Sequence, residues 1–208
     1  MTVDRRRLAR PALQVAPRLV GAVVASEFGG VRVAIRLTEV EAYEGVDDPA
    51  SHAFRGRTPR TEVMFGAPGH LYCYFTYGMH WCANIVCGTD GVAAAVLLRA
   101  GEVIDGRDAA GARRPTARRD VDLARGPARL ATCLGLDRDA NGIDLCARDS
   151  AVRLESMPTS RRRGVTAGPR VGIGAAADLA WRFWLTGDPT VSAFRPGGRR
   201  RPRPGRAD

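Results

Sequence analysis

The sequence contains no lysine: all 32 of its basic residues are arginines, against 22 aspartates and glutamates, and the formal net charge is +10. The missing side-chain amine excludes an enzyme that forms a Schiff base with a sugar or carbonyl substrate through lysine. A GC-rich coding bias would explain the preference for arginine but not the charge excess, which favours a polyanion or an acidic membrane surface. Because no basic amphipathic helix is evident, nucleic acid is the partner that we expect.

Paired cysteines and long apolar runs are also missing. The five cysteines include no Cys-x-x-Cys motif, so we expect reduced thiols packed as small apolar side chains and no metal site. No run of about 18 apolar residues is present, and no apolar segment with a cleavage site opens the chain. These absences predict a soluble protein that is neither exported nor bound to a membrane.

At 208 residues the chain is long enough for one domain with a substantial core and short for two. Residues 1–10 are arginine-rich and are expected to form a flexible basic N-terminus. Residues 11–194 are expected to form the single domain. Residues 195–208 consist largely of Arg, Pro and Gly and are expected to be a disordered tail.

Residues 31–43 alternate in the manner of a β-strand. One face of this strand begins with apolar side chains and continues into carboxylates and a phenol: Val31, Val33, Ile35, Leu37, Glu39, Glu41 and Tyr43. This pattern predicts a strand that runs out of the core into a cleft. A one-residue bulge, which would turn Val40 and Ala42 inward instead, remains an alternative.

The segments that follow predict a functional loop and a hairpin. Residues 44–68, rich in Gly, Pro, Asp and Arg, are too long for a plain connection and carry His52. Residues 69–76 alternate, Tyr77-Gly78 interrupts the pattern, and residues 79–86 form the return strand, which places Tyr77 near an exposed tip. The apolar run 92–98 predicts a central strand that ends at Arg99. Helices are expected at 17–25 and 126–135, and short strands at 143–146, 152–154 and 181–185.

Reactive side chains are concentrated between residues 38 and 84. Glu41 lies beside Tyr43, and Arg99 ends a neighbouring strand. Desolvation would raise the pKa of this carboxyl group, whereas the guanidinium would keep it ionised. Such a carboxylate can deprotonate a water molecule. A purely structural Glu–Arg pair is the alternative.

Aromatic side chains accompany this carboxylate. Tyr43, Tyr74 and His52 can surround a flat ligand, because aromatic faces stack on bases and attract cationic rings; ordinary core packing would also explain them. Tyr77 at a hairpin tip suggests a wedge between base pairs. Asn84 is either a base-reading amide or a satisfied amide at a strand end. Taken together, the residues indicate a nucleobase flipped out of a duplex.

The chain resembles the alkyladenine (3-methyladenine) DNA glycosylases of the mammalian type. The motifs that carry the resemblance run in order along nearly the whole chain: Thr38-Glu39-Val40-Glu41-Ala42-Tyr43, Thr58-Pro59-Arg60, Tyr77-Gly78-Met79, Val96-Leu97-Leu98-Arg99-Ala100, Gly126-Pro127, Arg170-Val171-Gly172-Ile173-Gly174 and Pro189-Thr190-Val191-Ser192. The family fold is α+β: a single mixed domain around a curved, mostly antiparallel sheet flanked by helices, like the C-terminal domain of formyltransferases. It uses no metal or cofactor.

The resemblance implies a monofunctional DNA N-glycosylase. Such an enzyme flips alkylated or deaminated purines (3-methyladenine, hypoxanthine, ethenoadenine) out of double-stranded DNA and hydrolyses the N-glycosidic bond, leaving an abasic site. By position, Glu41 corresponds to the base that activates water, and Arg99 and the backbone carbonyl of Val171 to the groups that position it.

The resemblance also assigns the remaining site residues. The base pocket comprises Tyr43, His52, Tyr74 and Asn84; Tyr77 and Met79 enter the duplex; Arg60, Arg129 and Arg138 face phosphates. A monomer is expected, in the cytoplasm of a bacterial-type cell and associated with the nucleoid through DNA. His80, Thr76 and the replacement of every lysine by arginine depart from the family and leave the substrate range open.

Two other functions compete with this one. The first is a non-catalytic module that recognises flipped, damaged bases, for which Glu41 would be superfluous. The second is an RNA-binding β domain that uses the same tyrosines, which would prefer single strands and tolerate Glu41→Gln. All three share a basic surface, so salt-dependent binding does not distinguish them.

Overall fold

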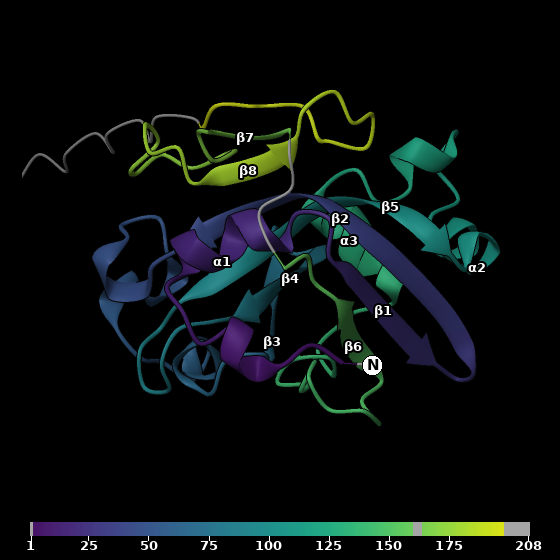
Figure 1. Cartoon of the computed structure of the whole chain (residues 1–208). Helices are drawn as coiled ribbons and strands as arrows, with labels where there is room; N and C mark the ends of the chain where they lie inside the picture. Colours follow the sequence, from purple (N-terminus) through teal and green to yellow (C-terminus); the bar gives the residue numbers. More distant parts are fainter. Residues whose placement is uncertain (1, 160–163, 198–208) are drawn as a thin grey trace, which may run out of the picture.

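The computed structural model describes residues 2–159 and 164–197. A curled antiparallel sheet organises this part of the chain (Figure 1): six strands follow the order β3-β4-β5-β2-β1-β6, and β8, paired with β7, joins at β2. The strands are β1 (Val23–Phe28), β2 (Val31–Tyr43), β3 (Leu71–Thr76), β4 (His80–Val86), β5 (Ala95–Asp105), β6 (Val152–Ser156), β7 (Val165–Gly168) and β8 (Arg182–Leu185); the helices are α1 (Ala12–Leu19), α2 (Arg107–Arg113) and α3 (Pro127–Leu134). The expected α+β fold around a curved, mostly antiparallel sheet is confirmed.

Two apolar clusters hold the sheet. The larger lies where α1 and α3 meet the sheet and contains Leu19, Leu37, Leu98 and Leu134, all fully buried. The smaller lies under the 44–68 loop and joins Met64 and Phe65 of the loop to Tyr72 of β3. Because successive side chains of a strand point to opposite faces, Tyr72 packs under the loop while its neighbours Leu71 and Cys73 belong to the larger cluster. The sheet is therefore covered on both faces near β3 and β4.

A bulge in β2 decides where its two carboxylates point. The register with β5 shifts between Leu37 and Glu39 and again between Glu39 and Val40. Leu37 and Val40 consequently both belong to the larger core, whereas Glu39 and Glu41 lie on the other face, where each is fully buried. The bulge alternative is correct, and the expectation of one uninterrupted face that runs from the core into a cleft is wrong. On that face Arg182 of β8 and the Ser192 N–H contact Glu39, and the Val171 N–H contacts Glu41.

The hairpin of β3 and β4 forms as predicted. Thr76 pairs with His80 across residues 77–79, which turn the chain. Tyr77 adopts φ 51°, a left-handed conformation that is uncommon outside glycine, and its side chain is 85% exposed. Met79 is also exposed. The tip therefore presents two large apolar side chains to solvent.

The 44–68 loop has local structure of its own. It contains three short 3-10 turns, at Gly45–Asp47, His52–Arg55 and Glu62–Phe65. Ser51 begins the turn that carries His52, because its hydroxyl accepts a hydrogen bond from the Ala53 N–H. Gly45 has φ 62°, and a Cβ there would lie 2.0 Å from the carbonyl oxygen of Ala93, so only glycine fits. These constraints place His52 over the sheet.

Several predicted boundaries are wrong. The helix expected at 17–25 is α1, which ends at Leu19; Gly21, with φ 89°, then turns the chain into β1. The strand expected to end at Arg99 continues to Asp105, because buried carboxylates compensate the charge of Arg99 within the strand. Residues 143–146 form no strand; Asp144 makes only an isolated bridge with His70. By contrast, α3 and β6 lie where helix 126–135 and strand 152–154 were expected.

The N-terminal residues pack against the domain, which contradicts the flexible N-terminus expected there. Arg5–Arg7 forms a 3-10 helix capped by the Asp4 carboxylate, and Leu8 is fully buried. Arg5 also pairs with Asp144 at 2.6 Å. Of the tail expected from 195 to 208, residues 198–208 lie outside the described residues. The Arg195 carbonyl accepts a hydrogen bond of 2.9 Å from the Gly172 N–H, so the start of this segment contacts the site.

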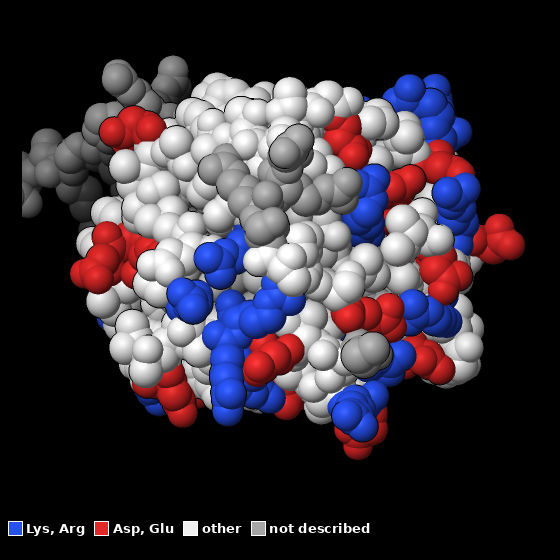
Figure 2. All heavy atoms as spheres, viewed as in Figure 1, with Lys and Arg blue, Asp and Glu red and all other residues white. Residues whose placement is uncertain are grey.

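On the face seen in Figure 2, arginines and carboxylates lie next to one another mainly in the lower half and at the right, and much of the rest is uncharged. Ion pairs of this kind include Arg32 with Glu155, at 2.7 Å, and Arg153 with Glu27, at 3.0 Å. The basic excess is therefore not gathered into one continuous patch on this face. Within residues 2–159 and 164–197, no helix has the length and apolar character needed to cross a membrane.

Candidate active site

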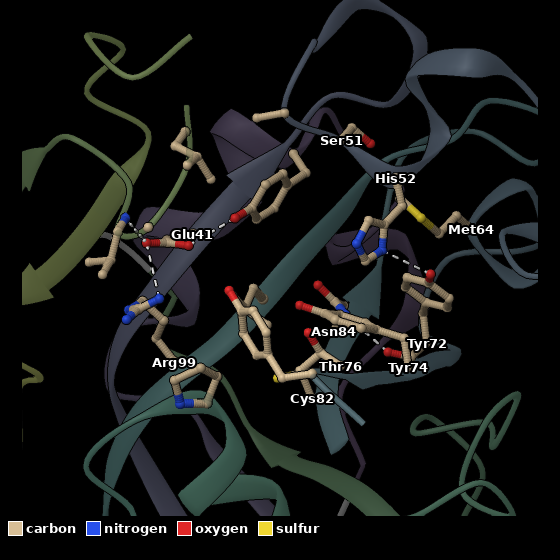
Figure 3. A pocket seen from close by; sticks show the side chains of 18 residues that line it. Glu41, Ser51, His52, Met64, Tyr72, Tyr74, Thr76, Cys82, Asn84 and Arg99 are labelled. Atoms are coloured by element: carbon tan, nitrogen blue, oxygen red, sulfur yellow. Dashed lines mark hydrogen bonds and ion pairs between the residues drawn. The ribbon is translucent and has the colours of Figure 1, made fainter. Parts of the chain in front are cut away.

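A cavity of about 360 Å³ opens on the face of the sheet that carries the carboxylates. Its walls come from β2, β3, β4 and β5, the 44–68 loop, Pro127 at the start of α3 and residues 171–173. All seven residues predicted for catalysis and the base pocket line it: Glu41, Tyr43, His52, Tyr74, Asn84, Arg99 and Val171. Figure 3 shows Glu41 and Arg99 at one end and His52, Met64 and Tyr72 at the other, with Asn84 between the two ends.

Glu41 is fully buried, and both of its carboxylate oxygens have partners. Oε2 accepts a hydrogen bond of 2.9 Å from the Tyr43 hydroxyl, and Oε1 accepts one of 2.7 Å from the Val171 N–H. Arg99 Nη1 lies 3.4 Å from Oε1. The carboxylate is thus held in one orientation from three sides.

The pKa of Glu41 reflects opposing effects. Burial is the largest and raises it. The charge of Arg99, the Val171 N–H and the Tyr43 hydroxyl lower it, and the nearby Glu39 raises it, with a net upward shift. A carboxyl group with a raised pKa is a stronger base once ionised, which suits it to take a proton from water.

A second buried carboxylate lies behind the first. Glu39 Oε1 accepts hydrogen bonds of 3.0 Å from both Arg99 Nε and Arg182 Nη1, and Oε2 accepts one of 2.8 Å from the Ser192 N–H. Arg99 therefore does form a buried structural pair with a glutamate, as the alternative interpretation of the sequence suggested, but its hydrogen-bonded partner is Glu39 and not Glu41. Glu41 interacts with the outer edge of the same guanidinium and faces the cavity.

The far end of the cavity is aromatic. His52 lies edge-on to Tyr74, with ring centroids 4.5 Å apart, and its Nδ1 is 3.1 Å from the Tyr72 hydroxyl. Part of the imidazole reaches solvent at the cavity mouth, but burial of the rest, together with Arg60, lowers the pKa of His52 to about 4. Burial raises the pKa of Tyr72 and Tyr74. These rings are therefore uncharged near neutral pH and offer apolar faces.

Asn84 lies on the cavity floor opposite Tyr72 in the β3–β4 pairing. Its Nδ2 donates a hydrogen bond of 3.0 Å to the Tyr72 carbonyl, which fixes the orientation of the amide. Cys82 lines the same floor and is paired with Tyr74 across the strands. The amide is both a satisfied strand side chain and a polar group in the cavity, so the two readings of Asn84 do not exclude each other.

Arg170, which sequence reasoning did not single out, joins two walls of the cavity. It is buried, pairs through both terminal nitrogens with the Asp48 carboxylate, and donates a hydrogen bond of 2.9 Å to the Ala42 carbonyl. Its guanidinium carbon lies 4.6 Å from the centroid of Tyr43 and 4.9 Å from that of Trp181. This contact supports the Tyr43 ring from behind and ties the 44–68 loop to Val171.

The residues predicted to contact DNA lie mostly outside the cavity lining. Tyr77 borders it, whereas Met79 lies beyond it on the hairpin tip. Arg60, Arg129 and Arg138 are exposed, but they do not line the cavity. Arg60 lies over the ring of Tyr74, 5.7 Å from its centroid, and Arg129 lies on the first turns of α3, near Pro127.

Other cavity residues escaped sequence reasoning. Tyr72 and Thr76 share the predicted face of Tyr74, so the alternation of β3 is a signal that could have found them. Asp48, Arg182 and Ser192 contact cavity residues from behind the wall, and no pattern in the sequence around them indicates this role. Among the described residues, no three His, Cys, Asp or Glu side chains cluster in a way that could hold a metal ion, and all five cysteines are free thiols.

Comparison with known proteins places this geometry in a family. A model of the methylpurine-DNA glycosylase (MPG) family matches residues 6–189. A protein of Streptomyces avermitilis is 50% identical over 196 residues, covering 93% of this chain and 92% of its own. Proteins of Nocardia farcinica and Mycobacterium tuberculosis are 51% and 48% identical, covering 86% and 95% of this chain and 85% and 96% of their own.

Each of these three relatives carries the name "Putative 3-methyladenine DNA glycosylase". The family match includes every residue that lines the cavity, from Glu41 to Ile173. The chain belongs to the methylpurine-DNA glycosylase family and is a DNA N-glycosylase of DNA repair.

Proposed function

We propose that the protein flips an alkylated or deaminated purine out of duplex DNA into this cavity and hydrolyses its N-glycosidic bond with a water molecule activated by Glu41. One observation carries the proposal. Glu41 is fully buried at the end of an aromatic cavity, with its oxygens oriented by Tyr43, Val171 and Arg99. A module that only recognised damaged bases would gain nothing from burying a carboxylate beside the flipped nucleotide.

The chemistry follows from this placement. As the bond between the sugar C1′ and the base nitrogen breaks, its electron pair leaves with the base and positive charge develops on the sugar. A carboxylate nearby stabilises that charge. Glu41 takes a proton from the water whose oxygen bonds to C1′ and then releases that proton to solvent. A cationic alkylated purine leaves as the neutral base, and a neutral lesion leaves as an anion that takes up a proton from solvent, so the products are the free base and an abasic site. Arg99 keeps Glu41 ionised, and with the Val171 carbonyl it is assigned to positioning the water.

The substrate class follows from the aromatic end. Tyr43, His52 and Tyr74 offer uncharged ring faces, which bind purines by stacking and attract the cationic rings of alkylated purines especially. Neutral lesions such as hypoxanthine and ethenoadenine also fit a stacking pocket. We propose that the fixed amide of Asn84 disfavours undamaged guanine through its exocyclic amine.

The exposed side chains complete the proposed complex. Tyr77 and Met79 at the hairpin tip fill the gap that the flipped nucleotide leaves in the duplex. Arg60, Arg129 and Arg138 contact phosphates, where arginine keeps the charge that a lysine would supply. The protein is proposed to act on the duplex as a monomer.

The test is single-turnover excision from duplex oligonucleotides that carry hypoxanthine or ethenoadenine, beside release of 3-methyladenine from methylated DNA. We expect released base and a strand that stays intact until alkali cleaves the abasic site. Strand cleavage without alkali would contradict the monofunctional mechanism. Binding of all three lesions without release of any base would contradict the proposed reaction.

A further inference from the structure

The reaction proposed above does not use the buried carboxylate of Glu39. Glu39 is as completely buried as Glu41 and lies two residues before it on β2. Three donors from three segments point at its carboxylate: Arg99 Nε of β5, Arg182 Nη1 of β8 and the Ser192 N–H. Burial of a charge is costly unless it is paired, so such a group needs a reason to be where it is.

The Arg99 guanidinium connects the two carboxylates. Its Nε donates to Glu39 at 3.0 Å, and its Nη1 lies 3.4 Å from Glu41 Oε1. A guanidinium is planar and rigid, so fixing Nε also fixes the direction of Nη1. The position of Arg99 against Glu41 therefore depends on Glu39.

Arg182 completes the cluster. Its side chain is 7% exposed and its guanidinium lies 4.1 Å from the centroid of Trp184 and 5.2 Å from that of Phe194. Nη1 donates to Glu39, whereas Nε is buried without a hydrogen-bond partner among the described residues. The two carboxylates, Glu39 and Glu41, thus balance the charge of the two guanidiniums, Arg99 and Arg182. Of these four groups, the Glu41 carboxylate is the one that takes up a proton in the proposed reaction.

We propose that Glu39 is a positioning residue of the reaction: it orients Arg99 against Glu41, and its negative charge offsets the two guanidiniums so that Glu41 remains a usable base. This inference rests on the proposed role of Glu41 as general base. Glu39 itself neither lines the cavity nor touches substrate there.

An amide cannot replace this carboxylate. Both oxygens of Glu39 accept, one from two arginines and the other from a backbone N–H. Glutamine has one acceptor oxygen, so its NH₂ group would face a donor in either orientation. Glu39→Gln therefore removes charge and misdirects Arg99, whereas Glu39→Asp keeps the charge and shortens the reach.

The experiment measures the single-turnover rate of excision from a hypoxanthine duplex as a function of pH. The acidic limb of this profile, where Glu41 becomes protonated, is the part compared between variants. Charged and titratable groups face Glu41 from its own strand (Glu39 and Tyr43), from β5 (Arg99) and from β3 (Tyr74), and Arg182 of β8 acts through Glu39. We compare Glu39→Gln with Arg182→Met, which keeps the packing volume against Trp184 but removes the opposite charge.

Both variants should move the acidic limb to higher pH, for different reasons. In Arg182→Met a positive charge that favours ionised Glu41 is lost, and the limb moves by about 0.5–1 unit. In Glu39→Gln the displaced Arg99 no longer favours ionised Glu41, and its charge lowers the pKa of Glu41 more than the charge of Glu39 raises it, so the limb again moves to higher pH. The maximal rate falls about tenfold or more in Glu39→Gln, because Arg99 is misplaced. Glu155→Gln, which breaks the pair with Arg32, is the matched control and should keep the wild-type profile.

An unmoved limb together with a wild-type maximal rate in folded Glu39→Gln would overturn the proposal, because a merely structural role predicts neither change. If Glu39→Gln does not fold, Glu39→Asp decides: we expect a lower maximal rate, and a wild-type rate would overturn the proposal. Glu41→Gln is measured alongside. If that variant excises at the wild-type rate, the proposed base is wrong; if it is inactive while Glu39→Gln behaves as wild type, only the role of Glu39 fails.

Discussion

The hydroxyl of Tyr43 donates a hydrogen bond of 2.9 Å to Glu41 Oε2, two residues back along the same strand. Both side chains point to one face because strand residues alternate, so β2 alone brings an aromatic wall and a carboxylate together. The ring of Tyr43 lines the cavity while its hydroxyl stabilises the ionised acid. One residue therefore serves two roles that substitution can separate.

Tyr43→Phe should keep the stacking face and lose the hydrogen bond. Because that bond favours the ionised carboxyl group, its loss raises the pKa of Glu41 further, and the acidic limb of the excision rate moves to higher pH, by about 0.5–1 unit. Affinity for the lesion duplex should stay close to wild type. A profile identical to that of the wild type, with the variant folded, would show that the Tyr43 hydroxyl has no influence on the base.

His52 should make the free energy of unfolding depend on pH. Its pKa is about 4 in the folded protein, below the ordinary 6.5. Between these values the unfolded chain binds a proton that the folded chain does not, so stability rises with pH across the window and levels off above it. Urea unfolding of wild type and His52→Gln at about pH 5 and about pH 7.5 should show a larger advantage of the wild type at the higher pH. An equal advantage at both values would contradict the lowered pKa.

The buried pair of Arg170 and Asp48 should show strong coupling. Arg170→Met leaves the Asp48 charge unpaired in the interior and should cost about 3–5 kcal/mol in the free energy of unfolding. The double variant Arg170→Met/Asp48→Leu should cost less than the sum of the single variants, because no buried charge remains. As a control, Arg32→Met should cost only about 0–1 kcal/mol in the free energy of unfolding, because the carboxylates that pair with Arg32 are partly exposed. Additive effects of the two single substitutions would contradict the coupling.

The parts of the fold that could be predicted from the sequence are those that follow from a pattern of neighbouring residues. Strand 31–43 and the hairpin around Tyr77 follow from alternation and a turn, and the structure has both. The bulge after Leu37 could not be chosen from the sequence, because the side chains on both faces of β2 are buried from Leu37 to Ala42 and carboxylates are rarely buried. Arg99 looked like the end of a strand because a charged side chain normally marks the surface.

The cavity was predictable in part for the same reason. Glu41 and Tyr43, like Tyr72 and Tyr74, are two residues apart on one strand, so alternation places each pair on a shared face. Their supporting residues come from distant segments: Arg170 reaches Asp48 across 122 positions, and Ser192 reaches Glu39 across 153. No spacing rule links such residues, so only the folded chain shows that the site has a second layer.

Tyr77→Ala should reduce excision by about tenfold or more while lowering affinity for undamaged duplex much less, since the wedge acts only when a base pair is opened at a cost of a few kcal/mol. Alanine is the appropriate truncation because φ at this position is 51°, and glycine would also relax the backbone. Val31→Ala, at another exposed hairpin, is the control. Equal loss of affinity for damaged and undamaged duplex would count against the wedge.

The measurement that tests the central claim most directly is single-turnover excision by wild type and Glu41→Gln, with binding to the same lesion duplex measured in parallel. Glu102→Gln, at the solvent side of β5, is the control for loss of a carboxylate. We predict that Glu41→Gln binds the lesion duplex with near wild-type affinity and releases base about 10²–10⁴ times more slowly. Excision by Glu41→Gln at the rate of the Glu102→Gln control would contradict the role of Glu41 as the base.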